Sequence, residues 1–298
     1  MGDRTDRAAA IFLNEGASSA RTNRVQAAVA LTRRALDADL HILDSSSPDE
    51  LRAWLAERIP GYTTAVVVGG DGTLGLAYNV AAPLPEGQRP VLGYIPAGFG
   101  NATAHLLNLP RHPAALAGLL ARGASRPVDL VSVDGRLALF AGAGWDAVVA
   151  GRYAAGRARR LPGWGRAMLG SLGELHRRFR VRVEVDGTVV HEGPMALVVA
   201  GTTPFYGRGL LVNPGARTDA GRMTLRVYPG PEPRLAMEAV RWAAHRRPSA
   251  VAFPAQSAVV ISLDGRPIPM QADGDLIGES AEWHVAVRPQ AVRLIGRW

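Results

Sequence analysis

Up to about Arg126, the hydrophobic and polar positions of the chain alternate between two periodicities. Short apolar runs such as AAAIFLN, DLHIL, TTAVVV and PVLGYI predict buried strands. The segments between them place apolar residues three or four positions apart, as residues 22–38 do with Val25, Val29 and Leu36, and this spacing predicts helices. Repeated strand and helix in this order predict a parallel sheet with helices on both faces.

Local signals mark where some of these elements begin. Ser47 precedes Pro48 and the run DELRAWLAERI, an order typical of an N-cap followed by proline in the first helical turn. Another helix is expected from about Thr73 to Ala81, directly after the strand TTAVVV. The first domain is therefore expected to be a layered α/β structure.

After PVDL, at residues 127–130, the pattern changes to short strands. Asp134-Gly135 and Asp186-Gly187 each lie between apolar runs, which is the strongest short-range indication of a β-hairpin. RVRVEVDGTVV alternates with period two, so one of its faces is expected to be buried and the other solvated. Further strand-like runs follow, with one or two helical segments, and together they predict a β-sandwich.

Composition narrows the possible chemistry. The 298 residues contain no cysteine, which excludes disulfides, thiolate metal sites and cysteine nucleophiles. All 34 basic residues are arginine, so a Walker A lysine, a kinase ATP-binding lysine and a Schiff-base lysine are excluded too. The net charge of +8 favours an anionic partner. The charged start MGDRTDR is unlike a signal peptide, and no apolar stretch reaches the length of a spanning helix.

Two glycine-rich loops are the main candidates for a binding site. VVVGGDGTLG ends a strand in Gly69, Gly70, Asp71, Gly72 and Thr73, and IPAGFGNATAHLL ends the next strand in a similar way. Ligands of open parallel sheets bind beyond the carboxyl ends of the strands, and the amides at helix starts attract phosphate. A single such loop could equally be a tight turn with glycines at positive φ. Two after neighbouring strands favour a nucleotide phosphate site.

The ordered motifs resemble the diacylglycerol-kinase catalytic family, which includes bacterial lipid kinases and sphingosine and ceramide kinases. The resemblance rests on GGDGT, PAGFGNATA, FLNEGAS, FAGAGWDA, FYGRGLLVNPGARTDAGRMTL and MQADGDLIG, in the family's order. It implies an N-terminal three-layer α/β domain like that of NAD and diacylglycerol kinases, and a C-terminal β-sandwich domain. We expect residues 1–127 and a returning segment 289–298 to form the first domain, and residues 128–288 to form the second, which binds the lipid substrate.

The resemblance also implies roles for individual residues. Asp71 matches the aspartate near the metal and phosphates, and Asp273 matches the proposed base for the lipid hydroxyl, so both are candidate catalytic residues. On spacing alone, Asp273-Gly274 would more readily be a hairpin turn. ATP and Mg²⁺ are the implied cosubstrate and metal. The ATP-binding candidates are Asn14, Gly69, Gly70, Asp71, Gly72, Thr73, Gly98, Gly100, Asn101 and Asp275, and the metal candidates are Asp71, Asp129 and Asp219.

Three positions depart from the family pattern. The second loop usually reads Gly-Thr-Gly-Asn-Asp, but Phe99 replaces its threonine and Ala102 its aspartate. The later metal loop usually reads Asp-Asp-Gly, and here it is Asp219-Ala220-Gly221, which puts the structural Mg²⁺ in doubt. These departures bear on activity rather than on fold.

The basic charge gathers in two segments. Residues 152–180 contain eight arginines and one glutamate among aromatic residues, and RLAMEAVRWAAHRRP ends in a basic cluster and contains Trp242. Anionic lipid attracts such segments and aromatic residues settle at its interface, although a solvated protein face is an equal alternative. No nucleic-acid-binding motif is present, so nucleic acid is not expected as a partner.

The sequence thus favours an ATP- and Mg²⁺-dependent lipid kinase that phosphorylates a lipid hydroxyl, such as that of diacylglycerol or a sphingoid base, at the cytoplasmic face of a membrane. A kinase for a soluble substrate such as NAD, and a catalytically weak lipid- or nucleotide-binding protein, are the alternatives. We expect a cytoplasmic protein that can associate peripherally with the inner face of the membrane. A homodimer is compatible with the sequence.

Overall fold

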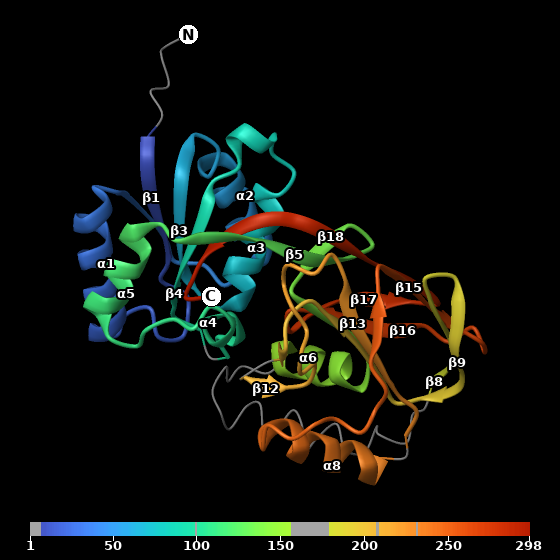
Figure 1. The fold of residues 1–298 in the computed structure, drawn as a ribbon. Coiled ribbons are helices and arrows are strands. Elements are labelled where there is room, and N and C mark those ends of the chain that lie inside the picture. Colours follow the sequence, from blue (N-terminus) through green and yellow to red (C-terminus); the bar gives the residue numbers. More distant parts are fainter. Residues whose placement is uncertain (1–6, 99, 156–178, 207–208, 231) are drawn as a thin grey trace. The chain divides into compact units, whose positions relative to one another are not determined.

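The structure is a computed structural model that describes residues 7–98, 100–155, 179–206, 209–230 and 232–298 (Figure 1). The chain divides into two compact units, residues 1–128 with 291–298 and residues 129–290. These boundaries lie next to the expected ones at 127/128 and 288/289.

The first unit is built around a parallel sheet. Its strands are β1 (Arg7–Asn14), β2 (Asp39–Leu43), β3 (Tyr62–Gly69) and β4 (Val91–Pro96), in the order β2-β1-β3-β4. The last residues of β18 (Glu282–Ile295) extend this sheet, since Arg293 and Leu294 pair in parallel with Val91 and Leu92 of β4. The end of the chain therefore returns to the first unit.

Helices cover both faces of this sheet. α1 (Asn23–Leu36) and α5 (Pro113–Arg122) pack together on one face, where Ile11, Val66 and Ile95 are buried (Figure 1). α2 (Pro48–Arg58) and α3 (Asp71–Ala81) pack together on the other. The remaining helical segments of the unit are η1 (Glu86–Gln88) and α4 (Ala102–Leu106).

Two local predictions in this unit can be compared with the structure. Ser47 is the N-cap of α2, and its hydroxyl accepts a hydrogen bond from the Glu50 amide at 3.4 Å, as the sequence predicts. α3 begins at Asp71 rather than at Thr73. Gly72 and Thr73 consequently belong to the first turn of the helix and not to the loop before it.

The second unit consists mainly of two sheets. One contains the unit-2 part of β18 with β15 (Ser257–Ser262), β8 (Phe179–Val185) and β9 (Thr188–Met195), and β5 (Ser125–Val133) and β6 (Arg136–Ala138) join it. The other has the order β14 (Phe253–Ala255), β13 (Met223–Tyr228), β10 (Leu197–Gly201), β7 (Phe140–Gly144), β16 (Ile268–Ala272) and β17 (Asp275–Ser280). Inward-facing residues such as Val183, Leu225 and Trp283 form their shared core, so the predicted β-sandwich is confirmed.

The described part of the second unit also contains two helices and a short ribbon. α6 (Trp145–Ala155) directly follows β7, and α8 (Glu232–Ala243) follows β13. β11 (Phe205–Tyr206) and β12 (Leu210–Leu211) form the ribbon. No helix within the described part of the chain is both long and apolar enough to cross a membrane.

Candidate active site

The two glycine loops of the first unit contact each other directly. β3 and β4 are neighbours, Gly69 is paired with Pro96, and the Ala97 amide donates to the Gly69 carbonyl at 2.7 Å. A Cβ added to Gly98 would overlap the Cα of Gly70, and one added to Gly69 would lie 2.6 Å from the Thr73 side chain. The loops therefore need glycine at these positions in order to pack together at the carboxyl edge of the sheet.

This packing decides between the two explanations of the glycines. The glycines of the two loops, namely Gly69, Gly70, Gly72, Gly98 and Gly100, are absent from the residues that adopt positive φ. The explanation by a tight turn with positive φ is therefore wrong for these loops. The backbone of one loop approaches the backbone of the other at Gly70 and Gly98.

Asp71 occupies the first position of α3 and reaches across to the start of α4. Its two carboxylate oxygens accept hydrogen bonds from the amides of Ala102, at 2.9 Å, and Thr103, at 3.0 Å. Burial raises the pKa of Asp71, and the hydrogen bonds from Thr103 and Ala102 act in the opposite direction. The Thr103 side chain also hydrogen-bonds to this carboxylate, whose four acceptor positions still leave capacity to bind a cation.

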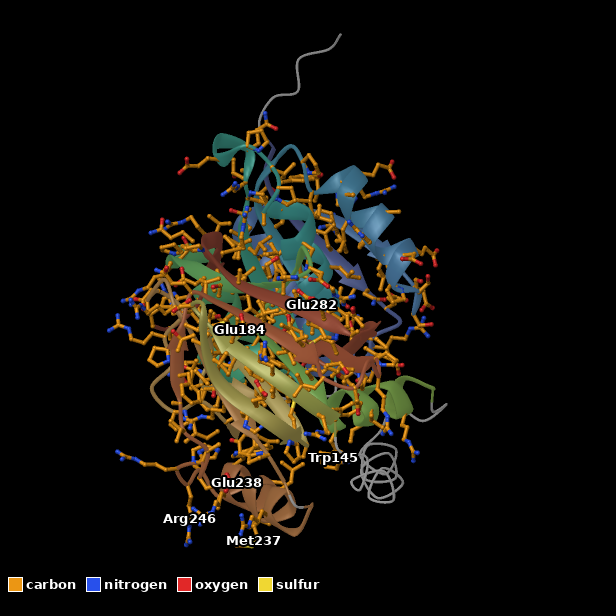
Figure 2. All side chains as sticks on the ribbon, turned by 90° about the vertical axis from the view of Figure 1, so that its right-hand side faces the viewer. Trp145, Glu184, Met237, Glu238, Arg246 and Glu282 are labelled. Atoms are coloured by element: carbon orange, nitrogen blue, oxygen red, sulfur yellow. The ribbon has the colours of Figure 1, made fainter. Side chains whose placement is uncertain are left out.

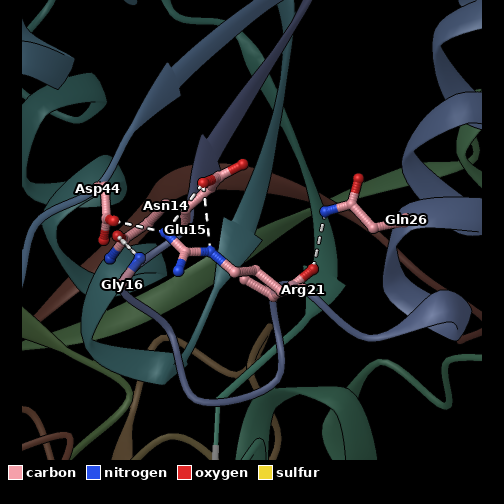
Figure 3. Close-up of polar contacts among 7 residues, drawn as sticks. Asn14, Glu15, Gly16, Arg21, Gln26 and Asp44 are labelled. Carbon is pink, nitrogen blue, oxygen red and sulfur yellow. Dashed lines mark hydrogen bonds and ion pairs between the residues drawn. The ribbon is translucent and has the colours of Figure 1, made fainter.

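Two asparagines order the surroundings of Asp71. The buried Asn14 donates to the Thr73 hydroxyl at 3.4 Å. It also accepts from the Gly16 amide at 2.9 Å (Figure 3). Asn101 accepts from Tyr94 and from the Gly98 amide, each at 3.0 Å, and donates to the Gly98 carbonyl at 2.7 Å. The structure thus brings Asn14, Thr73 and the two loops together, and the Asn101 side chain mainly holds its own loop.

Arg21, which sequence reasoning did not single out, lies in the loop after β1. Its guanidinium pairs with Glu15 at 3.2 Å and with Asp44, and all three side chains are at least partly exposed (Figure 3). The Gly16 position in the same loop has no room for a side chain, because a Cβ there would lie 2.5 Å from the Ser45 carbonyl oxygen. This loop is therefore ordered by its own ion pairs and close backbone contacts.

In the second unit, Asp273 lies in a hairpin turn. Ala272 of β16 pairs with Asp275 of β17, and the two residues between them adopt positive φ, 51° at Asp273 and 91° at Gly274. The Asp273 Oδ1 atom accepts hydrogen bonds from the amides of Leu139, at 3.0 Å, and Phe140, at 3.1 Å. The turn interpretation is confirmed, and the turn is also fixed to the start of β7.

Two other Asp-Gly turns of this unit share these features. Asp134-Gly135 joins β5 to β6 and Asp186-Gly187 joins β8 to β9, and all four residues have positive φ. The Asp186 carboxylate likewise accepts from two backbone amides, those of Gln256 and Ser257, at 3.0 and 2.8 Å. Backbone geometry therefore does not distinguish Asp273 from an aspartate with a purely structural role.

The remaining predicted acidic residues of this unit have defined partners. Asp275 forms an ion pair with Arg136 at 3.2 Å, and Asp219 forms one with Arg217 at 2.9 Å. Asp129 is buried, and its oxygens accept from the amides of Gly221, at 2.6 Å, and Gln290, at 2.8 Å. It thereby connects the loop that contains Gly221 to β18.

These contacts bear on the implied magnesium ion. Within the described ranges, no group of three or more His, Asp or Glu residues could form a dedicated metal cage. Mg²⁺ in kinases is usually held by one or two carboxylates together with substrate phosphates and waters. Asp71 fits that requirement as a single oxygen ligand at the glycine loops. Asp129 accepts from two backbone amides as Asp71 does and stays a predicted ligand, whereas Asp219 is paired with Arg217.

A buried polar group in the second unit escaped sequence reasoning. Asp146, at the start of α6, accepts hydrogen bonds from the Tyr206 hydroxyl and from the Gln271 amide, the latter at 3.0 Å. Gln271 also accepts from the Gly274 amide at 2.7 Å, so this group contacts the turn that carries Asp273. Burial raises the pKa of Asp146 to about 6, against the opposing effect of the Tyr206 and Gln271 hydrogen bonds.

The sequence contained one signal for this group. A Cβ at Gly142 would overlap the Asp146 carboxylate and lie 2.7 Å from the Tyr206 hydroxyl, so the small residues of FAGAGWDA leave space for it. The alternation of glycine and alanine before a lone aspartate could have indicated a buried carboxylate. Its partners, however, lie 60 and 125 residues further along the chain.

The fold and both loops agree with comparisons to known proteins. A family model described as the diacylglycerol kinase catalytic domain matches residues 8–133, and one described as the YegS C-terminal NAD kinase beta sandwich-like domain matches residues 140–296. The chain therefore belongs to the diacylglycerol kinase catalytic-domain family. Within that family, its C-terminal half places it with the YegS-like proteins.

Individual relatives show the same affiliation. A Pseudomonas aeruginosa PAO1 protein named "Probable lipid kinase YegS-like" is 30% identical over 213 residues, which cover 70% of this chain and 68% of that protein. A Mycobacterium tuberculosis H37Rv protein named "Diacylglycerol kinase" is 33% identical over 186 residues, and the match spans only 58% of its length. A solved structure described as a diacylglycerol kinase from Bacillus anthracis str. Sterne covers 100% of this chain with a TM-score of 0.76 at 20% identity, a likeness of fold.

Proposed function

We propose that this protein is an ATP- and Mg²⁺-dependent lipid kinase that transfers the γ-phosphoryl group of ATP to a hydroxyl of a lipid such as diacylglycerol or a sphingoid base. The observation that carries the proposal is the direct packing of Gly70 against Gly98, with Asp71 beside both loops. Amides at helix starts attract phosphate, and the carboxyl edge of a parallel sheet is where nucleotides bind. Membership of the diacylglycerol kinase family supports the same conclusion.

The ATP phosphates would lie against the backbone of Gly69, Gly70, Gly98 and Gly100, with α3 and its residues Gly72 and Thr73 beginning there. Asn14 and Asn101 keep the loops in shape through the hydrogen bonds described above. Asp71 would hold Mg²⁺ through one carboxylate, and the ion supplies charge neutralisation for the transferring phosphoryl group. Asp275, paired with Arg136, is proposed as a further contact to ATP.

Asp273 is proposed as the general base. The lipid hydroxyl oxygen attacks the γ-phosphorus, the bond from phosphorus to the bridging oxygen breaks, and ADP leaves with the electron pair. The hydroxyl proton passes to the Asp273 carboxylate, which keeps unused lone pairs beside the two amides it accepts from. Proton acceptance of this kind typically accelerates a reaction ~10²–10⁴-fold.

The proposal is tested with radiolabelled ATP and a panel of diacylglycerol, sphingosine and phosphatidylglycerol in detergent micelles, beside NAD in solution. Labelled phosphate should appear in at least one lipid, should require Mg²⁺, and should be absent with Asp71→Asn. Transfer to NAD alone would overturn the lipid assignment. Failure of the folded protein to transfer phosphate to any acceptor would favour a binding protein of the same fold.

Two observations are the reason why the assay also tests for an NAD kinase and for a binding protein. The matching model of the second unit is described as NAD kinase beta sandwich-like, which is why NAD is included. Ala102 stands where the family usually has an aspartate, and only its backbone amide reaches Asp71. One negative charge beside Asp71 is therefore missing, which is the feature that favours weak activity.

A further inference from the structure

One surface of the second unit combines exposed apolar side chains with arginines. We define the α8 outer face by Arg234, Met237, Val240 and Arg241, which follow one another at helical spacing. Met237 and Val240 are 59% and 68% exposed, among the most exposed large hydrophobic residues of the described chain. A solvated helix face usually carries polar residues at such positions.

The opposite side of α8 is firmly packed. Leu235 and Trp242 are buried in a cluster with Tyr228, and the rings of Trp242 and Tyr228 lie 5.5 Å apart in an edge-to-face arrangement. Glu238 is buried as well and accepts from the Ser249 amide at 3.0 Å. Figure 2 shows Glu238 on the side of α8 toward its own unit and Met237 on the far side. The exposure of the outer face thus follows from the orientation in which the helix is fixed.

This packing corrects the expectation for Trp242. The tryptophan, which the sequence suggested as an aromatic residue at a lipid interface, belongs to the protein core. The residues that remain available for an interface are the aliphatic Met237 and Val240, followed in the chain by Val251, which is 67% exposed. The other expected basic segment, residues 152–180, lies largely outside the described residues.

After Glu232, which begins α8, the charge of this segment is mainly positive. From Pro233 to Leu263 the only acidic residue in the sequence is Glu238, which is buried and lies 3.6 Å from Arg241. Arg246 and Arg247 follow α8 and are exposed, and Arg246 projects outward in Figure 2. Exposed aliphatic residues beside several arginines match an anionic lipid surface, into which the apolar side chains insert while the guanidinium groups remain at the phosphates.

We propose that the α8 outer face, with Arg246, Arg247 and Val251, is the surface by which this protein docks on an anionic lipid bilayer. Arg247 also borders a cavity of about 420 Å³, which gives a lipid phosphate room beside the arginines. This docking surface adds a membrane contact to the proposed lipid kinase. Its biological purpose rests on that proposed function. Docking itself requires no phosphoryl transfer, so binding and turnover can be measured separately.

The test is cosedimentation of the full chain with vesicles of phosphatidylcholine, with and without phosphatidylglycerol. The wild type should bind only the anionic vesicles, and binding should fall with salt, because exposed charges are screened over about 8 Å at physiological ionic strength. Arg246→Gln with Arg247→Gln should weaken binding roughly 25-fold, since each surface arginine contributes about fivefold. Met237→Ser with Val240→Ser should weaken it about tenfold.

Matched controls remove the same groups elsewhere. Arg33→Gln with Arg34→Gln removes the same charge from the exposed side of α1, and Leu31→Ser with Val189→Ser removes two exposed apolar side chains, 41% and 48% exposed. Each control should change binding less than about twofold. Equal losses from the controls and the α8 variants would overturn the docking surface, because general charge attraction would explain them.

The remaining outcomes separate the two proposals. Absence of anionic vesicle binding by a wild type that phosphorylates lipid in micelles would overturn the docking surface and leave the kinase proposal standing. Binding that needs Met237 and Arg246 in a protein without kinase activity would support the docking surface and contradict the kinase. Unchanged thermal unfolding of the variants, expected from the exposure of these side chains, shows that any loss of binding comes from the surface.

Discussion

Replacement of Asp273 by asparagine distinguishes a catalytic base from a structural turn residue. The amide keeps the shape of the carboxylate but cannot take a proton from a hydroxyl. Asparagine also tolerates the positive φ of 51° at this position as well as aspartate does. If Asp273 is the base, kcat should fall ~10²–10⁴-fold while the KM for ATP stays nearly constant.

The hydrogen bonds of Asp273 set the expected effect on stability. Its Oδ1 atom accepts from both the Leu139 and Phe140 amides, so the asparagine carbonyl oxygen can keep both bonds, while the longer contact from Leu139 to Oδ2, at 3.3 Å, is lost. The free energy of unfolding should therefore change by about 1 kcal/mol or less. Asp273→Ala would leave two amides of buried residues without their acceptor, at about 1–3 kcal/mol each. Asparagine is thus the informative variant.

Asp186→Asn provides the matched control. Asp186 precedes glycine in the same kind of hairpin turn, and its Oδ1 also accepts from two backbone amides. Steady-state kinetics and urea unfolding of both variants should show equal, small losses of stability, and a loss of kcat for Asp273→Asn alone. A near-normal kcat for Asp273→Asn would refute the role as base and leave Asp273 as the anchor of a turn.

Three further predictions concern the other groups of the site. Asp71→Asn should reduce Mg²⁺-dependent turnover ~100-fold or more with intact far-UV circular dichroism, and unchanged turnover would remove Asp71 from the mechanism. Gly98→Ala should force the loops apart, because its Cβ would meet Gly70, at a cost of about 1–3 kcal/mol of stability. Calorimetry should then show weaker ATP binding, and normal ATP affinity would contradict the phosphate site. Folding raises the pKa of Asp146 from 3.8 to about 6, so between these pH values the native state binds more protons than the unfolded state. The free energy of unfolding should therefore fall by up to about 3 kcal/mol as the pH rises from about 4 to about 6. Urea titrations of Asp146→Asn should lack this decline, and an identical decline in the variant would refute the assignment.

The features predicted correctly from the sequence depend on neighbouring residues. The Ser47 cap, the Asp134-Gly135 and Asp186-Gly187 hairpins and the alternation of strand and helix each follow from a few consecutive positions. The contact of Gly70 with Gly98 joins two loops that no periodicity relates, and therefore the reason for the glycines required the structure. The same holds for Asp146 and Gln271, which lie on different elements 125 residues apart.

Residue type alone also misled where the environment decides the role. Trp242 has the chemistry of an interfacial residue, but the burial of its side of α8 assigns it to the core. Asp129 has the chemistry of a metal ligand, but its carboxylate also joins the amides of Gly221 and Gln290, so a structural role explains its burial too and the metal role stays a prediction. In both cases the neighbours that bear on the role come from other segments of the chain.

The departures from the family pattern can now be interpreted physically. At Ala102, the backbone amide still holds Asp71, so the missing carboxylate is not needed for the position of that residue. Near Ala220, the amide of Gly221 is held by Asp129, so the loop keeps its anchor without a second aspartate. Both substitutions therefore remove negative charge without removing a hydrogen bond on which the backbone depends. Because Ala102 is buried beside the Asp71 carboxylate, Ala102→Asp should lower the stability in the absence of Mg²⁺ and alter the Mg²⁺ dependence of turnover, whereas no change in either would show that the added carboxylate lies away from Asp71.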